Sequence, residues 1–598
     1  MQAGQGESER DVTPDSTTGE RHLRQRLRRL VRTSELGIVA LAALVGVVAG
    51  LVVIAMNATL QLLHELLFRI PTAGHLSITE GLAPWLVLLA PALGGLAFGL
   101  CVRAFLRTRA SPPVDPIEAN ALQGGRMSLG DSLIVALQTL FSSGVGASVG
   151  LEAGYTQAAA GFASWFGRVF HVRRADLRLL VGCGAGAAIG AAFDAPLMGA
   201  FYGFELVLGT YAIPAFVPMM TATFAAALTQ QVLAPPHHPP LPELSAPQLS
   251  DLPSVLLLGF FCALVGIAVM RGATLVEAGF RRSALPAWLR PAVGGLIVGA
   301  LALWNPAVLS AGHGAVYHFL AADTGLVMAA LLLVAKVTAS SVSIGAGFRG
   351  GLFFASLLMG VMAGRVYAAG MGLILPDLVP AHAFYALIGM SALAVAVVGG
   401  PMTMTLLALE MTGNLQLTLA VLAAAGTASL ATRRLFGFSF ATWRFHLRGE
   451  NIRGAHDIGW LRELTVATLM RREVPLIDID TALMAARHRY PPGATAYLVA
   501  TEQGRYAGMI APAALFETVE GEPPPTLRAL LRLADSSLLP TATLREALDL
   551  FERTEADALA VTLPDGTVAG VLSEAHAVKR YSDEMGRRLA EVTGEKFD

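Results

Sequence analysis

The chain has 598 residues, of which 54% are hydrophobic and only 15% are charged. Soluble globular proteins carry about 25% charged residues, so an ordinary soluble protein would need a very large core to bury this sequence. The formal net charge of −1 excludes a nucleic-acid-binding protein that depends on bulk positive charge, and we expect no nucleic-acid partner.

The shortage of charge is concentrated in long blocks. No Asp, Glu, Lys or Arg occurs over 36–64, 206–242 or 378–409. A helix that spans a bilayer needs about 20 apolar residues, and each block is longer than that. The sequence therefore predicts a polytopic membrane protein, and we expect a bacterial-type inner or plasma membrane.

The first 35 residues are polar and are predicted to be disordered. The stretch 21–32 carries six arginines directly before the first apolar segment, and the positive-inside rule then places this end in the cytoplasm. An arginine-rich surface helix without topological meaning is the alternative. We expect no cleavable signal peptide, because the first apolar segment is too long for a signal core.

The apolar region from 36 to about 450 is interrupted by glycine and proline, as at 141–154 and 343–354. Irregular backbone at membrane depth is tolerated only where protein or a water-filled cavity satisfies its polar groups. These breaks therefore predict broken helices that line a permeation route. A proline-rich loop at 235–248 divides the region into halves at about 36–234 and 250–450.

The two halves look related. Pro196 stands nine residues before Glu205, and Pro401 stands nine residues before Glu410. Matching helix interruptions in two halves are typical of a transporter built from two structural repeats, with its substrate site at their interface. Chance similarity between two apolar stretches is the alternative.

Glu152 is a carboxylate among glycines in an otherwise charge-free membrane segment. An acid at this depth is costly to bury and indicates a functional site. The glycines allow helix N-termini to converge, and their N–H groups attract anions. We predict that Glu152 occupies an anion site as a mimic of the anion, blocks it, and leaves when protonated. A glutamate that snorkels or forms a salt bridge between helices is the alternative.

A second glycine-rich stretch lies at 345–354. Its glycines would free the backbone amides of Leu352 and Phe353 to face an anion, and the Phe353 ring would narrow the path. Close helix packing would explain such a stretch equally well.

Several ordered motifs of the membrane part resemble the CLC family of chloride channels and proton-coupled chloride exchangers. GLEAG at 150–154 is similar to the family's G-[KR]-E-G-P, and GGLFFA at 350–355 to its G-G-x-F-x-P. Further similar segments lie at 190–206, 305–316 and 399–414.

The resemblance implies an all-α polytopic membrane fold with broken helices and an inverted-topology repeat. It also implies a homodimer with one pore per subunit and with Glu152 as the gate. The anion would be bound mostly by backbone groups at Gly150, Leu151, Glu152, Gly351, Leu352 and Phe353.

Three positions lack the side chain that the family uses. The family's anion-coordinating serine falls at Pro113, or at Pro112 in a shifted alignment, and its pore tyrosine falls at Ala441. The inward-facing glutamate that relays protons in the exchangers falls at Leu206, which cannot titrate. We expect Glu205 beside it to keep a structural role.

After about 450 the composition changes to a charged α/β tail of two similar units. The tail resembles a pair of cystathionine-β-synthase (CBS) domains at 463–518 and 525–582, followed by a C-terminal segment at 583–598. Such pairs bind adenine nucleotides through a Gly-x-x-[ST]-x-x-Asp motif. The second unit keeps Gly570 and Ser573 but has His576 in place of the Asp, so a nucleotide is a weak expectation and no cofactor is certain.

We predict transport of chloride or another small monovalent anion, with passive conduction slightly favoured. An electrogenic anion/proton exchanger is the main alternative, and a transport-inactive sensor that reports through the tail is a weaker one. We expect no enzyme activity and no metal site. Cys101, Cys183 and Cys262 lie in apolar surroundings without ligand spacing, so they indicate neither a metal site nor a disulfide framework.

Overall fold

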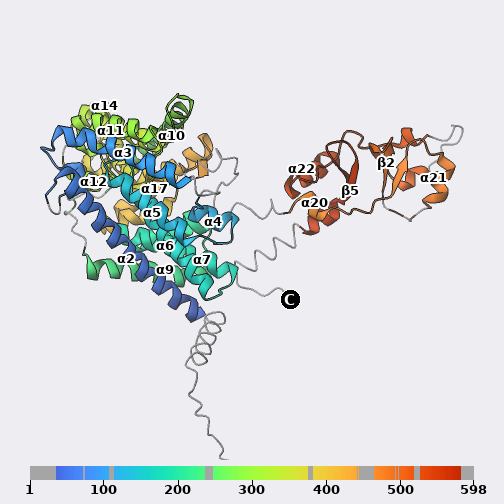
Figure 1. Ribbon diagram of the computed structural model, residues 1–598, viewed down its shortest axis with the longest axis horizontal. Helices are drawn as coiled ribbons and strands as arrows, with labels where there is room; N and C mark the ends of the chain where they lie inside the picture. The colour runs from blue at the N-terminus through green and yellow to red at the C-terminus, as the bar shows by residue number, and fades with distance from the viewer. Residues whose placement is uncertain are drawn as a thin grey trace, which may run out of the picture. The chain divides into compact units, whose positions relative to one another are not determined.

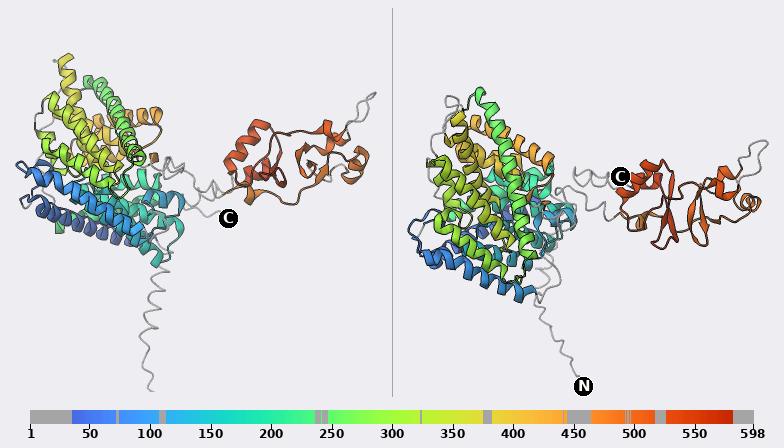
Figure 2. Two further views of the ribbon diagram at one scale, coloured as in Figure 1. Left: turned by 45° about the horizontal axis from the view of Figure 1, so that its top comes forward. Right: turned by 90° about the horizontal axis from the view of Figure 1, so that it is seen from above.

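The structure is a computed structural model that divides into two compact units, 1–457 and 458–598, drawn in Figures 1 and 2. It describes residues 35–71, 74–106, 113–235, 241, 247–322, 324–374, 382–440, 442–443, 464–491, 493, 495, 497–516 and 526–580. The predictions for the arginine-rich N-terminus, Pro112, Ala441 and the segment 583–598 lie outside the described residues.

The first unit is helical, and its elements follow the two halves of the sequence. The first half contains α2 (Glu35–Phe68), α3 (Pro84–Leu106), α4 (Pro116–Leu122), α5 (Leu129–Gly144), α6 (Glu152–Val169), α7 (Arg174–Phe193), α8 (Pro196–Tyr202), the π-helical turn η2 (Gly203–Leu208) and α9 (Ile213–Leu233). The second contains α10 (Leu252–Arg282), α11 (Arg290–Trp304), η4 (Pro306–Val308), α12 (His313–Ala321), α13 (Leu326–Gly345), α14 (Phe353–Ile374), α15 (His382–Val398), α16 (Pro401–Thr412) and α17 (Leu415–Leu435).

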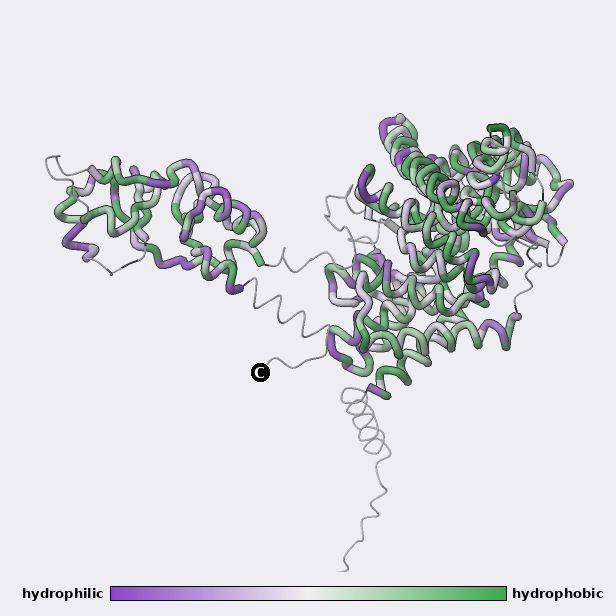
Figure 3. Tube along the Cα trace, turned by 180° about the vertical axis from the view of Figure 1, so that it is seen from behind, coloured by the Kyte–Doolittle hydropathy of each residue, from purple (hydrophilic) through white to green (hydrophobic). Residues whose placement is uncertain are grey.

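Hydrophobic residues dominate the helices of this unit, as Figure 3 shows. Within the described residues, eight helices are long and apolar enough to cross a bilayer. Large apolar side chains such as Leu93, Leu228 and Val334 are at least 60% exposed. Such a surface suits lipid rather than water, which agrees with the predicted polytopic membrane protein.

Helix packing repeats between the halves. α2 packs against α9, and α10 packs against α17; α6 packs against α7, and α14 against α15. The two halves meet where α3 packs against α11. There a Cβ at Gly95 would collide with the Pro291 carbonyl, and one at Gly295 with the Pro91 carbonyl. The matching contacts confirm the inverted repeat, which rests on backbones that approach closely.

The short helices α8 and α16 form another contact between the halves. Each begins at a proline, which suits the first turn because a proline has no N–H to satisfy there. Asp194, with φ of 51°, ends α7 just before α8, whereas Gly400, with φ of 72°, precedes α16. Left-handed residues thus turn the chain sharply at both breaks.

Two glutamates close this contact reciprocally. Glu410, near the end of α16, accepts hydrogen bonds from the Leu197 and Met198 amides at 2.8 and 2.9 Å. Glu205, in the turn η2 that follows α8, accepts them from the Met402 and Thr403 amides at 3.0 and 2.9 Å. Each carboxylate satisfies the orphan N–H groups of the partner helix and complements its dipole. This is the structural role expected for Glu205.

The tail unit consists of two β-rich halves with the same plan. The first has α20 (Val466–Leu469), β1 (Leu476–Asp478), α21 (Leu483–Arg489), β2 (Leu498–Glu502), β3 (Arg505–Ile510) and η6 (Pro512–Leu515), and the second has η7 (Leu527–Leu530), α22 (Leu544–Thr554), β4 (Ala558–Thr562) and β5 (Val568–Ser573). β1 pairs parallel with β2, and β2 pairs antiparallel with β3. β4 and β5 form the equivalent antiparallel hairpin, and Leu538 supplies the equivalent parallel bridge to Val561.

Candidate functional site

The two glycine-rich breaks meet in the interior of the membrane unit. Gly150 and Gly351 form an antiparallel bridge, in which each N–H donates to the other's carbonyl at 2.9 and 3.1 Å. Each glycine lies just before the start of a helix, α6 or α14. The bridge therefore brings two helix N-termini together, as the sequence predicted.

Serines at the ends of α5 and α13 hold the two loops in register. The Ser142 hydroxyl accepts from the Arg349 amide at 3.1 Å, and the Ser343 hydroxyl accepts from the Ser148 amide at 2.9 Å. These two bonds are equivalent in the two repeats. The loops are thus fixed by side chains that cross from one half to the other, which preorganises the amides that follow them.

The Glu152 carboxylate lies at this convergence. Its Oε1 accepts a hydrogen bond from the Phe354 amide in the first turn of α14 at 2.8 Å. The side chain is 3% exposed. Glu152 is also the first residue of α6, so its charge lies at the positive ends of two helices. The predicted donors, the Leu352 and Phe353 amides, make no hydrogen bond to any residue that the structure describes.

The carboxylate covers the glycine bridge. A Cβ at Gly150 would collide with both Glu152 oxygens, and one at Gly351 would lie 2.8 Å from Oε2. Within the described residues Oε2 is buried without a hydrogen-bond partner. Glycine at both positions is therefore what allows the side chain to adopt this conformation, and one carboxylate oxygen is left unsatisfied.

Lys336 is a buried basic residue near this site that the sequence reasoning missed. Its side chain is 1% exposed, and its Nζ donates to the Val308 and Ser310 carbonyls at 3.2 and 2.9 Å. It lies close enough to Glu152 for their charges to attract. A lone lysine in the apolar stretch 326–345 was the signal that could have revealed it.

The start of α4 differs from the loop in which the family has its anion-coordinating serine. Pro113 is partly buried and supplies no hydroxyl. Asp115 caps the helix instead, since its Oδ1 accepts from the Ile117 amide at 2.9 Å. Asp before Pro116 is a usual helix start, so the sequence held this signal, although the reasoning from the family motif passed over it.

Tyr202 brings a hydroxyl to the same region. Its ring centroid lies 6.2 Å from that of Phe353, and it packs with Val114 against one apolar cluster. The hydroxyl lies within range of the charges of Asp115 and Glu152 and makes no hydrogen bond to a residue that the structure describes. Leu206, four residues later, lies near Gly399 and provides no titratable group.

Comparison with known proteins identifies the membrane unit. The profile of the voltage gated chloride channel family, the CLC family, matches residues 93–433. The chain is a member of this family. CLC proteins transport anions, so this CLC protein belongs to a family of anion transporters and channels. A CBS domain profile matches residues 536–583 in the tail.

Curated relatives and solved structures agree with this membership. The voltage-gated ClC-type chloride channel ClcB of Escherichia coli O81 is 32% identical over 405 residues, 66% of this chain and 95% of that protein. A putative ClcB-like chloride channel protein of Ralstonia nicotianae is 33% identical over 391 residues, 64% and 91% of the two chains.

Two crystal structures share the fold. That of a slow cyanobacterial Cl−/H+ antiporter has a TM-score of 0.61 at 22% identity and covers 69% of this chain and 97% of its own. That of a CLC-type fluoride/proton antiporter has a TM-score of 0.55 at 18% identity and covers 67% and 97%.

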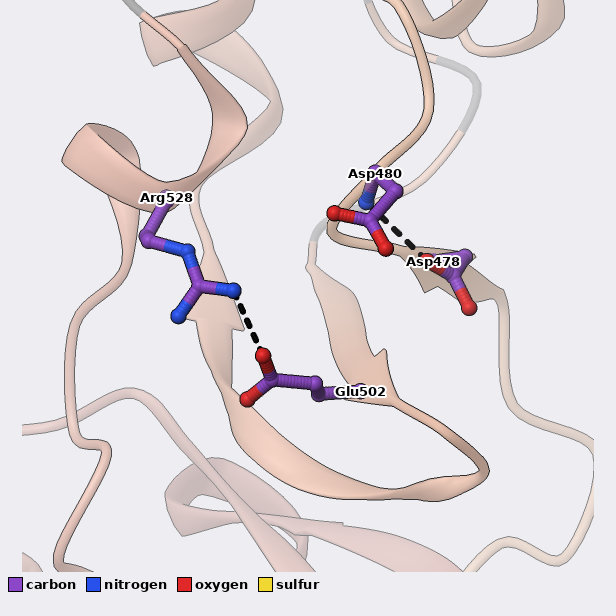
Figure 4. A network of polar contacts seen from close by, with 4 residues as sticks. All are labelled: Asp478, Asp480, Glu502 and Arg528. Atoms are coloured by element: carbon purple, nitrogen blue, oxygen red, sulfur yellow. Dashed lines mark hydrogen bonds and ion pairs between the residues drawn. The ribbon is translucent and has the colours of Figure 1, made fainter.

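Of the tail residues considered for a nucleotide, Gly570 has a local structural explanation. Gly570 lies in β5, where a Cβ would stand 2.6 Å from the Arg471 carbonyl. Ser573 ends the same strand and His576 lies three residues beyond it. Nucleotide binding stays a prediction. Figure 4 shows four charged residues of the tail, where Arg528 of η7 reaches Glu502 of β2 at 2.5 Å and the Asp480 amide donates to Asp478 at 3.0 Å.

Proposed function

We propose that this CLC protein moves chloride or another small monovalent anion through the junction of its two repeats, with the Glu152 carboxylate as the gate. One observation carries the proposal. Glu152 Oε1 accepts a hydrogen bond from the Phe354 amide, while the side chain covers Gly150 and Gly351. A carboxylate bound to a helix N-terminus occupies the kind of position that a small anion would take.

Protonation gives the gate its mechanism. Charged Glu152 is held by the Phe354 amide and by the positive ends of α6 and α14. A neutral carboxyl group loses most of this attraction, so the side chain leaves and an anion takes its place at the amides. The free Leu352 and Phe353 amides lie next to that position and bind the anion through backbone groups.

Tyr202 offers a substitute for the pore hydroxyls that the chain lacks. Pro113 cannot donate a hydrogen bond, and the family's pore tyrosine falls at Ala441. The Tyr202 phenol lies beside Phe353 and has no competing partner among the described residues. We assign Tyr202 the role of the side-chain hydroxyl donor to the anion in the path.

Passive conduction is the favoured mode, because Leu206 cannot relay protons from the cytoplasmic side. An anion/proton exchanger is the second candidate. The Tyr202 hydroxyl lies within range of the charges of both Asp115 and Glu152, which favours it, since a hydroxyl near two carboxylates can take part in proton transfer. Two proteins of the same fold are described as proton antiporters.

We also propose a homodimer with one pathway per subunit, with the N-terminus and the tail in the cytoplasm. The Gly150–Gly351 junction and Glu152 come from a single chain, so each subunit has the parts of a complete pathway. Cross-linking in native membranes measures the assembly, and protease access to the tail in sealed inverted vesicles measures the orientation.

The test is anion flux in liposomes that contain the purified full chain. Glu152→Ala and Glu152→Gln are expected to raise chloride flux and to remove most of its pH dependence, because neither side chain can carry the blocking charge. Glu80→Gln, which changes an exposed carboxylate of the same unit, is the matched control. Unchanged pH dependence in both Glu152 variants would contradict the gate.

Reversal potentials under opposed anion and pH gradients separate the two modes. A passive pore follows the anion gradient alone, whereas an exchanger shifts with the pH gradient. Chloride, fluoride, nitrate and bicarbonate are compared while proton movement is recorded. Absence of flux for all four anions, with nucleotide binding retained, would favour the sensor.

A further inference from the structure

A cavity of about 650 Å³ lies in the membrane unit, apart from the proposed anion path. It is lined by the ends of α3, α10 and α13, the start of α11 and the loop 346–349. Its described lining residues include none of Gly150, Glu152, Phe353 and Leu206. The proposed function therefore does not account for this cavity.

The lining combines positive charge with apolar walls. Its charged residues are four arginines and one glutamate: Arg103, Arg281, Arg290, Arg349 and Glu277. Phe98, Trp288, Ile344 and Phe348 supply aromatic and aliphatic walls. Such a lining suits an anion that carries an apolar part, since guanidinium groups bind phosphate oxygens bidentately.

The single lining acid does not neutralise Arg103, Arg281 and Arg290. Glu277 lies 3.8 Å from Arg281 in a pair that is largely exposed to solvent, and such pairs are weak. The Arg103 guanidinium lies 5.8 Å from the centre of the Trp288 ring and forms no ion pair with a residue that the structure describes. Arg290 donates from Nε to the Leu285 carbonyl at 3.2 Å, which leaves its other N–H groups to a ligand.

The cavity opens at a helix end that suits the cytoplasmic leaflet. Arginines gather at the end of α3 and α10 and at the start of α11, and the positive-inside rule assigns such ends to the cytoplasm. The same helices present exposed leucines, with Leu100 47%, Leu275 72% and Leu296 46% exposed. Acyl chains can lie along this apolar surface while a headgroup enters the cavity.

We propose that this cavity binds the phosphate headgroup of an anionic phospholipid from the cytoplasmic leaflet. Basic pockets between membrane helices at this level are suited to such headgroups. The phosphate contacts Arg103, Arg281 and Arg290, and Trp288 packs against the glycerol and upper acyl region. A soluble phosphate offers the same charge but gains nothing from the apolar walls.

The lipid site is connected to the anion path through one short loop. Phe348 and Arg349 line the cavity, and the Arg349 amide is held by Ser142. The next two residues lead to Gly351, which pairs with Gly150 beneath Glu152. A bound headgroup stabilises this loop and so favours the arrangement that seats Glu152. This regulatory step rests on the proposed function, whereas lipid binding does not.

Binding is tested without transport, on the full chain in phosphatidylcholine vesicles with or without a fraction of brominated phosphatidylglycerol. Trp288 lines the cavity, so bromine quenching that is lost in Trp288→Phe reports occupancy of this site. The double variant Arg103→Gln, Arg281→Gln is expected to weaken lipid binding about 30-fold, as measured by the quenching, since each of the two arginines near a lipid phosphate contributes about 1 kcal/mol. The matched control is Arg282→Gln, Arg433→Gln, two exposed arginines at helix ends outside the described lining.

Three outcomes decide the proposal. Quenching through Trp288 that needs the anionic lipid and falls only in the double variant supports it. Equal quenching in the double variant and the control overturns it. Pyrophosphate that binds in pure phosphatidylcholine vesicles and displaces the brominated lipid overturns the lipid in favour of a soluble phosphate. Each outcome is independent of flux, so a failure here is distinguishable from a failure of the anion gate.

Discussion

Two of the junctions between the repeats differ in their symmetry. Where α8 meets α16, Glu205 and Glu410 occupy equivalent positions and make equivalent hydrogen bonds to the opposite helix. Where α6 meets α14, Gly150 and Gly351 are equivalent, but Glu152 stands opposite Phe353. The first junction has a proline and a glutamate at matching places on both sides and holds the halves together. The second has equivalent glycines on both sides but a titratable group, Glu152, on one side only.

This contrast separates structural acids from the functional candidate. All three glutamates lie in the membrane unit and accept backbone N–H groups at a helix start. Glu205 and Glu410 each bond two amides with both oxygens, whereas Glu152 bonds the Phe354 amide with one oxygen and leaves Oε2 without a partner in the described residues. A fully bonded carboxylate is stable where it is, whereas a half-bonded one is easier to displace.

The largest effect is expected at the symmetric junction. Glu410→Leu leaves the Leu197 and Met198 amides without acceptors at a helix start. Each lost hydrogen bond to a charged group costs about 1.5–3 kcal/mol, so the loss of stability is about 3 kcal/mol or more. Thermal unfolding of the purified chain in detergent, followed by size-exclusion chromatography, measures it.

Glu205→Leu should cost at least as much, because Glu205 accepts from the Thr403 and Tyr211 hydroxyls in addition to its two amides. Glu80→Leu on an exposed segment should cost little. The double variant Glu205→Leu, Glu410→Leu tests whether the costs are independent. If Glu410→Leu unfolds at the temperature of the unchanged chain, the reciprocal caps do not hold the halves together.

The second prediction concerns the glycine frame beneath Glu152. Gly150→Ala places a methyl group where the carboxylate oxygens now lie, so the charged side chain cannot take its closed position. We expect chloride flux to rise several-fold at alkaline pH, where Glu152 carries its charge, and to resemble that of Glu152→Ala.

Gly130→Ala is the control, since a Cβ at Gly130 would only reach 4.0 Å from the Ser128 hydroxyl. A Gly150→Ala protein that folds, as judged by its thermal midpoint, and that keeps the original flux and pH dependence would show that the glycine does not define the closed position. Combining it with Glu152→Ala should produce no further rise, because both changes remove the same block.

The symmetric frame was predictable from sequence to a useful degree. The Pro196–Glu205 and Pro401–Glu410 spacings gave the repeat, and the glycine breaks gave the convergence at Glu152. The donor to Glu152 was not predictable, because the choice among the Leu352, Phe353 and Phe354 amides depends on the rotation of α14 by a fraction of a turn. The buried partners of Lys336 were also hidden, since they come from a loop distant in sequence.

The third prediction tests the hydroxyl beside the path. Tyr202→Phe removes one donor and keeps the ring contact with Phe353. We expect anion flux to fall only a few-fold, because backbone amides remain, while the preference among chloride, nitrate and fluoride changes. If Tyr202 also passes protons, proton movement coupled to chloride disappears in the same variant.

Tyr211→Phe provides a matched control, because its hydroxyl bonds Glu205 at the other junction. Flux and anion preference that are identical in Tyr202→Phe and the unchanged protein would remove Tyr202 from the path. An equal change in both variants would indicate a general effect of losing a phenol near the repeat interface.

The smallest effect is expected in the tail. There the two halves differ by one acidic residue in a turn that is exposed to solvent. Asp565 lies in the β4–β5 turn, at the position that Gln503 occupies in the β2–β3 turn of the tail's first half. Its Oδ1 accepts from the Thr567 hydroxyl at 2.7 Å and from the Thr567 amide at 2.9 Å. These bonds favour the charged form and hold the pKa of Asp565 below its usual value.

The sign of the pH dependence follows from the lowered pKa. The stabilisation is fully present above the unfolded pKa, which is about 3.9, and is lost as the pH falls through the folded pKa. In the full chain, the amide protection of the hairpin relative to Asp565→Asn should therefore decrease slightly between about pH 6 and pH 2. A difference that stays constant across this range would exclude the charge as its cause. Chloride flux should not change in Asp565→Asn. The hydrogen bonds of an exposed carboxylate can be replaced by bonds to water, so its loss has little effect, whereas a buried charge without a counterpart, such as that of Glu152, carries a large free-energy cost.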